Sequence, residues 1–483
     1  SAWFWKREYF LKFYEIYQEN LESSMKEFRS FAIRSDYIGR KMHMRMYDII
    51  DKKKRGQELT EQEIQYVIEG YVKEEIPDYQ VAAWLMAIFF HGLSDHELVK
   101  MTEYMAKSGD MVDLSKIQGI KVDKHSTGGV GDKTTLVIAP IVAACGGKVA
   151  KMSGRGLGFT GGTIDKLESI PGFRTAIDDK EFYNIVNRTG LAVIGQSGEI
   201  APADKKLYAL RDVTATVDSI PLIATSIMSK KLAAGSDKIL LDVTVGSGAF
   251  MKSKKDAIIL AQKMVAIGEG AGRETKAILT NMDVPLGIAV GNEIEVVEAI
   301  QTLQGKGPKD FQEICEVFAA NMLMLAKIAN EKEAHERVKE VIANGSALQK
   351  FAEMVKTQGG DSEYIYHADK FEPAKYHQDF IAPQDGWVVK MDTEICGKTA
   401  VVLGAGRETK DSAIDPKAGI YFYKKTGDKV KAGETVATLC ASDKEKLKAG
   451  VEYLKNGYFF GDQQVDPMKN IIAEVTKDSV IDN

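Results

Sequence analysis

Lys124-His-Ser-Thr-Gly-Gly-Val-Gly-Asp132 is the first of two glycine-rich stretches that decide the fold of this chain. The second is Lys151-Met-Ser-Gly-Arg-Gly-Leu-Gly158, which runs on to Thr163. Each stretch follows a β-like run and leads into a helix-like run. Glycine lets backbone N–H groups approach a ligand closely, hydroxyl groups donate hydrogen bonds, and lysine supplies positive charge. The two stretches together predict one phosphate that is held from two sides.

The sequence around these stretches alternates between strand and helix patterns. Short β-like runs at 120–122, 148–152 and 238–245 are separated by glycine turns and helices. This alternation is typical of βαβ units in a parallel or mixed sheet. Residues 46–108 and 203–234 instead have helical patterns. We expect these two helical segments to meet in one discontinuous domain, with hinges where the chain leaves it.

The C-terminal part has a different pattern. Segments 381–388 and 427–434 look like the paired hairpins of a biotinyl/lipoyl-type module. That module carries its modified lysine in a short turn, and no such turn lies between the two segments. We therefore favour a structural, β-rich half-barrel over a carrier module.

Composition excludes several classes of function. The net charge is -5, from 64 basic and 69 acidic residues, so charge gives no reason to expect nucleic-acid binding. The longest apolar run, 81–90, is far shorter than the roughly 20 residues of a membrane span. The cysteines are far apart in the chain, which predicts reduced thiols and a cytoplasmic protein. They are Cys145, Cys315, Cys396 and Cys440.

The first 43 residues crowd aromatic side chains among Lys and Glu. They lack the uninterrupted apolar segment of a signal peptide. Two interpretations stay open: an amphipathic helix that docks on this chain or a partner, and an upstream extension with no role.

The first glycine-rich stretch nearly matches the phosphate-binding loop of nucleoside triphosphatases. Asp132, however, stands between Gly131 and Lys133, which breaks the Gly-Lys-Thr contiguity and puts a carboxylate in the phosphate cradle. We therefore reject that class. His125 enters the same loop and is open to two interpretations, a structural histidine or a proton donor.

The second helical segment carries another group of polar side chains. Tyr208 and Arg211 are three residues apart, and Ser226 and Lys230 are four residues apart, so each pair shares one helix face. If both helix faces point at a cleft beside the α/β region, these donors would suit the carbonyl groups of a planar ligand. The alternative is an ordinary solvated surface.

These stretches carry a resemblance to the thymidine/pyrimidine-nucleoside phosphorylases, from about Met46 to the C-terminus. The matching motifs are Lys124 to Asp132, Ser153-Gly-Arg-Gly-Leu-Gly-Phe-Thr-Gly-Gly-Thr-Ile-Asp-Lys-Leu-Glu-Ser-Ile-Pro-Gly172, Tyr208-Ala-Leu-Arg-Asp-Val-Thr-Ala-Thr-Val-Asp-Ser219 and Ser226-Ile-Met-Ser-Lys-Lys231. The resemblance implies phosphorolysis of uridine, thymidine or deoxyuridine to a free base and ribose or deoxyribose 1-phosphate, in nucleoside salvage. It leaves open which base and which sugar are preferred.

The resemblance also implies a role for individual residues. Those expected to bind phosphate are Lys124, Ser126, Thr135, Lys151, Ser153 and Thr163. Those expected to bind the base are Tyr208, Arg211, Ser226 and Lys230. The expected catalytic residues are His125, Arg211 and Lys230, which would stabilise negative charge on the leaving pyrimidine.

The fold implied by the resemblance is α/β. It consists of a small discontinuous α-helical domain, a large α/β domain with a mixed sheet, and a C-terminal α+β portion. The expected boundaries are 1–43 for the extension, 44–108 and 203–234 for the helical domain, 120–196 and 237–372 for the α/β domain, and 373–483 for the C-terminal portion. Family members are homodimers that associate through the helical domain, so the expected partners are a second copy, phosphate and a pyrimidine nucleoside.

One departure from the family pattern concerns a metal ion. Some bacterial members hold potassium at the positions of Gly131, residue 133, Ala289 and Glu298. Lys133 replaces the threonine ligand here. We therefore expect no metal and no cofactor, with the ammonium group of Lys133 standing in for the ion, although loss of the site with Lys133 in solvent is the alternative.

Two other functions remain to be weighed. Anthranilate-type phosphoribosyltransferases share this fold and a related glycine-rich loop, but the polar group on the second helical segment argues against that class. A non-enzymatic binding role is suggested only by the N-terminal extension and the C-terminal module.

Overall fold

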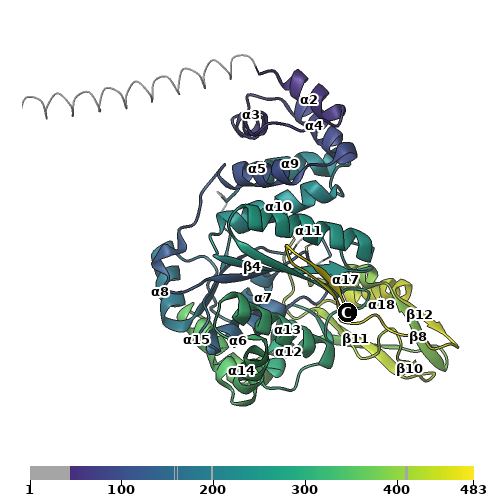
Figure 1. Ribbon diagram of the computed structural model, residues 1–483. Helices are drawn as coiled ribbons and strands as arrows, with labels where there is room; N and C mark the ends of the chain where they lie inside the picture. The colour runs from purple at the N-terminus through teal and green to yellow at the C-terminus, as the bar shows by residue number, and fades with distance from the viewer. Residues whose placement is uncertain (1–43, 157, 160, 197–199, 408, 410–411) are drawn as a thin grey trace, which may run out of the picture.

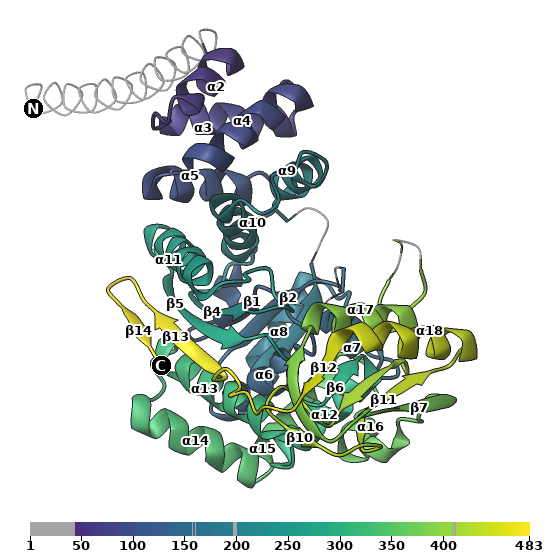
Figure 2. The same ribbon diagram turned by 90° about the vertical axis from the view of Figure 1, so that its right-hand side faces the viewer.

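The computed structural model describes residues 44–156, 158–159, 161–196, 200–407, 409 and 412–483. The expected extension at 1–43 lies outside these residues. Figures 1 and 2 show a layer of helices standing on a larger α/β body, with the C-terminal strands and helices on one side of that body.

The helical layer is built from two separate segments of the chain, as the sequence predicts. Its helices are α2 (Met46–Lys54), α3 (Glu61–Val72), α4 (Asp78–His91), α5 (Asp95–Ala106), α9 (Pro202–Val213) and α10 (Ile220–Ala233). Helices α3 and α5 begin with capping boxes, in which Thr60 pairs with Glu63 and Ser94 with Glu97. These reciprocal bonds satisfy the free N–H groups at each helix start.

The central sheet is mixed, and its strand order is β1-β4-β5-β13-β14. Strands β1 (Val122–Ser126), β4 (Lys238–Val245) and β5 (Glu274–Asn281) are parallel. Strand β13 (Ile471–Val475) pairs antiparallel with β5, and β14 (Val480–Asp482) continues from it. A second, two-stranded parallel sheet holds β2 (Val149–Ser153) and β3 (Leu191–Gly195).

Helices pack around these strands and bury the largest apolar cluster. They are α6 (Thr134–Ala144), α7 (Thr163–Glu168), α8 (Asp179–Thr189), α11 (Lys254–Gly270), α12 (Glu293–Leu303), α13 (Lys309–Leu325), α14 (Glu331–Ala343), α15 (Ser346–Thr357) and α16 (Glu363–Tyr366). Phe311, Phe318 and Phe351 are fully buried in this cluster. Helix α6 is apolar on every side, which fits its position within the core.

The C-terminal portion contains α17 (Thr393–Leu403) and α18 (Lys444–Leu454). One of its sheets has the order β6-β9-β11-β7 and the other β10-β8-β12. The strands are β6 (Ala289–Gly291), β7 (Tyr376–Ile381), β8 (Gly386–Met391), β9 (Gly419–Phe422), β10 (Lys429–Val430), β11 (Thr435–Ala441) and β12 (Tyr458–Gly461). Strand pairing crosses the boundary expected at residue 373, because β6 joins the C-terminal sheet and β13 joins the central one.

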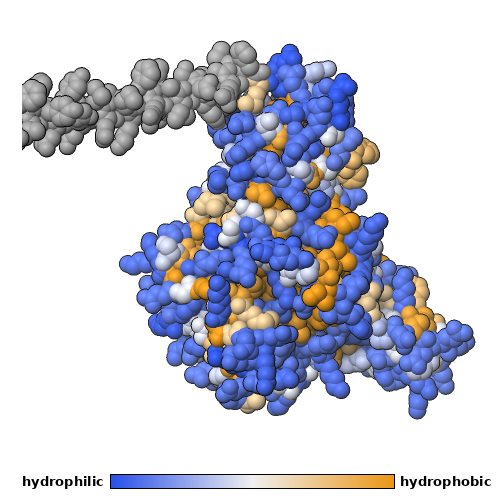
Figure 3. Space-filling model, viewed as in Figure 1, coloured by the Kyte–Doolittle hydropathy of each residue, from blue (hydrophilic) through white to orange (hydrophobic). Residues whose placement is uncertain are grey.

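The surface in Figure 3 is mostly polar, with apolar side chains gathered where the helical layer meets the α/β body. None of the helices in the described ranges combines the length and the apolar composition that crossing a bilayer would require.

Candidate active site

The first glycine-rich stretch begins inside strand β1 and ends at helix α6. Lys124 and Ser126 belong to the strand, and Thr135 is the second residue of the helix. Gly131 has φ +79°, and a Cβ atom at this position would lie 2.5 Å from the carbonyl oxygen of Leu286. Only glycine fits so close to a neighbouring backbone in this conformation. The loop is therefore shaped by its contact with residues far along the chain.

Lys124 is buried and paired with carboxylates. Its Nζ lies 2.8 Å from Oδ2 of Asp242 and 3.7 Å from Oδ1 of Asp132, and it donates a 2.6 Å hydrogen bond to Oγ1 of Thr134. Although burial opposes it, these two carboxylates raise the pKa of Lys124. Lys124 therefore stays charged, and its nearest partners are side chains of the protein itself.

The second glycine-rich stretch joins β2 to α7, with Ser153 at the end of the strand and Thr163 at the start of the helix. The N–H of Gly156 donates to Oδ2 of Asp165 at 2.7 Å. A Cβ atom at Gly162 would lie 2.1 Å from the same nitrogen. Gly156 and Gly162 are therefore packed tightly against each other and the first turn of α7.

Lys151 belongs to a buried group of three charges beneath the first stretch. Its Nζ lies 3.1 Å from Oδ1 of Asp123, while Lys231 of α10 donates to Oδ2 of Asp123 at 2.9 Å. Burial lowers the pKa of Lys151 to about 8, against the attraction of Asp123. Lys231 and Asp123 connect the helical layer directly to β1, so the two layers are joined beneath the site.

His125 follows Lys124 in β1 and is half-buried. Burial, with the charges of Lys231 and Lys151, lowers its pKa well below the usual value. The imidazole is therefore neutral near pH 7, which suits a hydrogen-bonding role better than a charged one.

The polar side chains expected to bind the base lie on α9 and α10. Lys230 pairs with Asp204 of α9 and donates to Oγ of Ser226 at 3.3 Å. Arg211 is buried, and its side chain lies 5.7 Å from the ring centre of Tyr208. The structure thus groups these four side chains on two neighbouring helices.

The Arg211 guanidinium also holds the connection between the two helices together. Its three nitrogens donate to the carbonyl oxygens of Thr216 at 3.2 Å, Val217 at 2.6 Å and Leu222 at 3.0 Å. Each of the two terminal nitrogens carries a second N–H group that these hydrogen bonds do not use. Arg211 therefore has a structural role in addition to the one that the sequence suggests.

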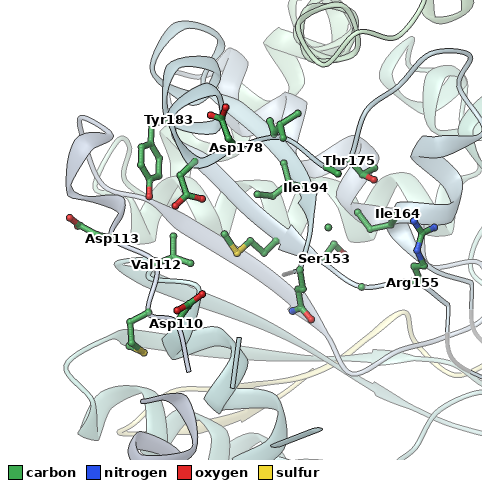
Figure 4. Close-up of a pocket in the computed structure, with 18 of the residues that line it drawn as sticks. Asp110, Val112, Asp113, Ser153, Arg155, Ile164, Thr175, Asp178, Tyr183 and Ile194 are labelled. Carbon is green, nitrogen blue, oxygen red and sulfur yellow. The ribbon is translucent and has the colours of Figure 1, made fainter. Parts of the chain in front are cut away.

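A cavity of about 1130 Å³ lies beside the second stretch. Figure 4 shows Asp110 and Asp113, from the segment between α5 and β1, at one end and Arg155 and Ile164 at the other. Among the residues predicted to bind phosphate, Ser153 lines this cavity. The cavity therefore lies next to Ser153, one of the residues expected to bind phosphate, and against the segment that leads from α5 to β1.

The potassium positions of the family do not fit a metal ion in this chain. The Nζ of Lys133 lies 2.5 Å from Oε2 of Glu298 and donates to the carbonyl oxygens of Leu286 at 2.8 Å and Ala289 at 2.9 Å. Although burial opposes it, the charge of Glu298 raises the pKa of Lys133. An ammonium group thus takes the oxygen donors that an ion would need, and Lys133 does not point to solvent.

Several charged residues that lie in the site were not predicted from the sequence. They are Asp123, Lys166, Asp204, Lys231, Asp242 and Glu295. Lys166 and Lys231 lie within the motifs that carry the family resemblance, and this position in the sequence could have marked them as residues of the site. The carboxylates lack a local signal, because each meets its lysine through the fold.

Comparisons with known proteins identify the relatives of this chain. The α/β domain of a glycosyl transferase family matches residues 118–348, its helical bundle domain matches 47–109, and the pyrimidine nucleoside phosphorylase C-terminal domain matches 387–460. The pyrimidine-nucleoside phosphorylase of Geobacillus stearothermophilus is 55% identical over 397 residues, which are 82% of this chain and 92% of that protein. The chain belongs to the pyrimidine-nucleoside phosphorylase family. This confirms the family and the fold class that the motifs predict.

Other relatives of this phosphorylase-family chain extend the comparison. The pyrimidine-nucleoside phosphorylase of Staphylococcus aureus strain N315 is 52% identical over 434 residues, covering 89% of this chain and all of that protein. Anthranilate phosphoribosyltransferase from Thermus thermophilus superposes with a TM-score of 0.53 at 19% identity, over 64% of this chain and 99% of that one. The second likeness shows the fold alone.

Proposed function

We propose that this phosphorylase-family protein catalyses the reversible phosphorolysis of pyrimidine nucleosides, with uridine, thymidine or deoxyuridine as substrate. The observation that carries the proposal is the Lys231–Asp123 ion pair. It ties the helix that bears Ser226 and Lys230 to the strand that bears His125 and begins the first phosphate loop. Groups suited to a pyrimidine and groups suited to phosphate are thereby held together.

The reaction follows from the chemistry of these two groups. Phosphate, held by hydroxyl and backbone donors of the two stretches, approaches C1′ of the sugar from one side. The C1′–N bond breaks as a C1′–O bond to phosphate forms, and the pyrimidine leaves with the electron pair and takes up a proton. Lys230 and Arg211 stabilise the negative charge that develops on the base, with His125 as a neutral donor. The products are the free base and ribose or deoxyribose 1-phosphate.

Approach of the two layers would bring phosphate in line with the sugar. No step requires a cofactor, and we propose that phosphate is the co-substrate.

Base release in the presence and absence of phosphate tests the proposal. We expect uracil to appear from uridine, or thymine from thymidine, only when phosphate or arsenate is added. Release at an equal rate in phosphate-free buffer would identify a hydrolase and contradict the proposal. Relative rates on uridine, thymidine and deoxyuridine then decide the base and sugar preference.

We further propose a homodimer that associates through the helical layer, in the cytoplasm. Tyr79 and Phe90 of α4 expose 73% and 74% of their surface, which supports a partner for this face. The four cysteines are free, which suits a reducing compartment. Sedimentation of the wild-type protein and of a Tyr79→Glu/Phe90→Glu variant tests the dimer, and a monomeric wild-type protein would contradict it.

A further inference from the structure

Lys166 is a fully buried lysine that the proposed mechanism does not use. It lies in α7, just after the second glycine-rich stretch, and none of its surface is exposed. Among the described residues its Nζ has no hydrogen-bond partner. A buried ammonium group without hydrogen bonds is costly, so its retention calls for an explanation.

The counter-charge of Lys166 comes from helix α12. Oε2 of Glu295 lies 3.3 Å from Nζ of Lys166, without the alignment of a hydrogen bond. The other oxygen of Glu295 accepts from the N–H of Gly291 at 2.9 Å, so the carboxylate is fixed by the backbone. Glu298, three residues further on the same helix, lies against Lys133, which directly follows the first stretch. Helix α12 thus presents one carboxylate to a lysine that follows each stretch.

The ammonium group of Lys166 lies against the second glycine-rich stretch and acts electrostatically on the first. A Cβ atom at Gly161 of the second stretch would lie 2.7 Å from its Nζ. Its charge also reaches Asp132 of the first stretch. Although burial opposes it, the charge of Lys124 lowers the pKa of Asp132, and Thr134, Ser126 and Lys166 act in the same direction.

We propose that Lys166 is a further phosphate-site residue, whose buried charge supplies positive potential beneath both glycine-rich stretches while Glu295 holds it in place. The inference rests on the proposed function, which puts phosphate between these stretches. A charge in a buried environment acts over several ångströms with little screening by solvent. Lys166 therefore strengthens phosphate binding without a direct contact, and Glu295 limits the effect by partial neutralisation.

Binding of inorganic phosphate to Lys166→Met tests this inference. Calorimetric titration of the full chain should show a dissociation constant raised by about tenfold or more, because a charge near the anion is lost. In steady-state assays KM for phosphate should rise while KM for the nucleoside stays unchanged. An unchanged dissociation constant in the folded variant would overturn the inference.

Glu295→Gln separates a charge effect from a merely structural one. Glutamine keeps an acceptor for the Gly291 N–H but removes the negative charge beside Lys166. Phosphate should then bind at least as tightly as in the wild-type protein, so the two variants should act in opposite directions. Weakening of phosphate binding by Glu295→Gln to the same extent as by Lys166→Met would show that the pair only shapes the loop.

Lys53→Met is the matched control. Lys53 is a buried lysine of α2 whose Nζ lies 2.8 Å from both oxygens of Glu97, in the helical layer. This variant should lose stability and leave the phosphate dissociation constant unchanged. If Lys166→Met fails to fold, Lys166→Met/Glu295→Met removes both charges together, which a fold tolerates better. It should still bind phosphate more weakly than Glu295→Gln, and equal affinity would overturn the inference.

Phosphate titration needs no turnover, so it distinguishes the two proposals. A protein that binds phosphate through Lys166 but releases no base contradicts only the proposed reaction. A protein that performs phosphorolysis with unchanged phosphate affinity in Lys166→Met contradicts only this inference.

Discussion

The phosphate loops and the base-binding helices are held in place by different means. Beneath the loops, Lys124, Lys133 and Lys166 are at most 3% exposed, and each is paired with a carboxylate from a distant segment. On the helices, the Lys230 side chain keeps 27% of its surface exposed. The first region is a fixed arrangement of internal charges, whereas the second leaves Lys230 partly exposed and buries Arg211 and Ser226.

This difference predicts which substitutions lower the stability of the fold and which lower the activity alone. Removing one member of a buried ion pair leaves an uncompensated charge and costs about 3–5 kcal/mol. Removing an exposed donor to a developing anion affects the reaction and leaves the fold intact. Arg211 belongs to both classes, because its side chain is buried among backbone carbonyl groups.

Arg211→Ala should have the largest effect. We expect kcat/KM to fall by at least about two orders of magnitude, since one charged donor to the leaving base is lost. The melting temperature should fall as well, because three carbonyl oxygens lose their donor. Activity assays and thermal unfolding check both effects, and near-full activity would show that the base lies elsewhere.

Lys230→Ala should lower kcat/KM by a similar factor of about 100 or more. The melting temperature should fall as well, because the buried carboxylate of Asp204 loses its partner. The control is Lys205→Ala, which removes an exposed lysine of the neighbouring helix α9. Equal losses of activity in the two variants would mean that Lys230 has no special role. His125→Ala should be milder than either site variant, because His125 is one of several donors.

Lys133→Thr should have an intermediate effect that depends on the cation. The variant leaves Glu298 buried without its partner, so stability and activity should fall in sodium buffer. Potassium should restore both, because threonine returns an oxygen ligand to the site. In contrast, exchanging potassium for sodium should leave the wild-type enzyme unchanged. A wild-type enzyme that requires potassium would contradict the ammonium account.

The smallest effect concerns the protonation of His125. Its imidazole should remain neutral as pH falls through about 6.5, the usual value for histidine. The unfolded chain takes up this proton first, so this group lowers stability as pH falls below about 6.5. Imidazole NMR signals, assigned by comparison with His125→Asn, check the titration. A His125 pKa at or above 6.5 would contradict the prediction.

Local features of the fold and the site could be predicted from the sequence. The capping boxes at Thr60 and Ser94 depend on residues three positions apart, and strand β4 lies where its apolar pattern indicates. The two glycine-rich stretches could be recognised because their backbone shape demands particular residue types. Their motifs also carry the resemblance that identified the family.

Long-range pairing could not be predicted in the same way. The Lys166–Glu295 pair joins positions far apart in the chain. The residues next to each of them in the sequence do not indicate that the two side chains meet. Strand β13 likewise reaches back to β5, although its position in the sequence lies within the C-terminal portion. The bonds of Arg211 to Thr216 and Leu222 depend on the turn between two helices, which spacing on one helix face does not reveal.

A crystal structure with inorganic phosphate and a pyrimidine base tests the central claim most directly. The account predicts phosphate between the two glycine-rich stretches, in contact with Ser126, Ser153 and Thr163, and the base against Ser226 and Lys230. Phosphate bound outside these stretches, or a base bound away from α9 and α10, would contradict it.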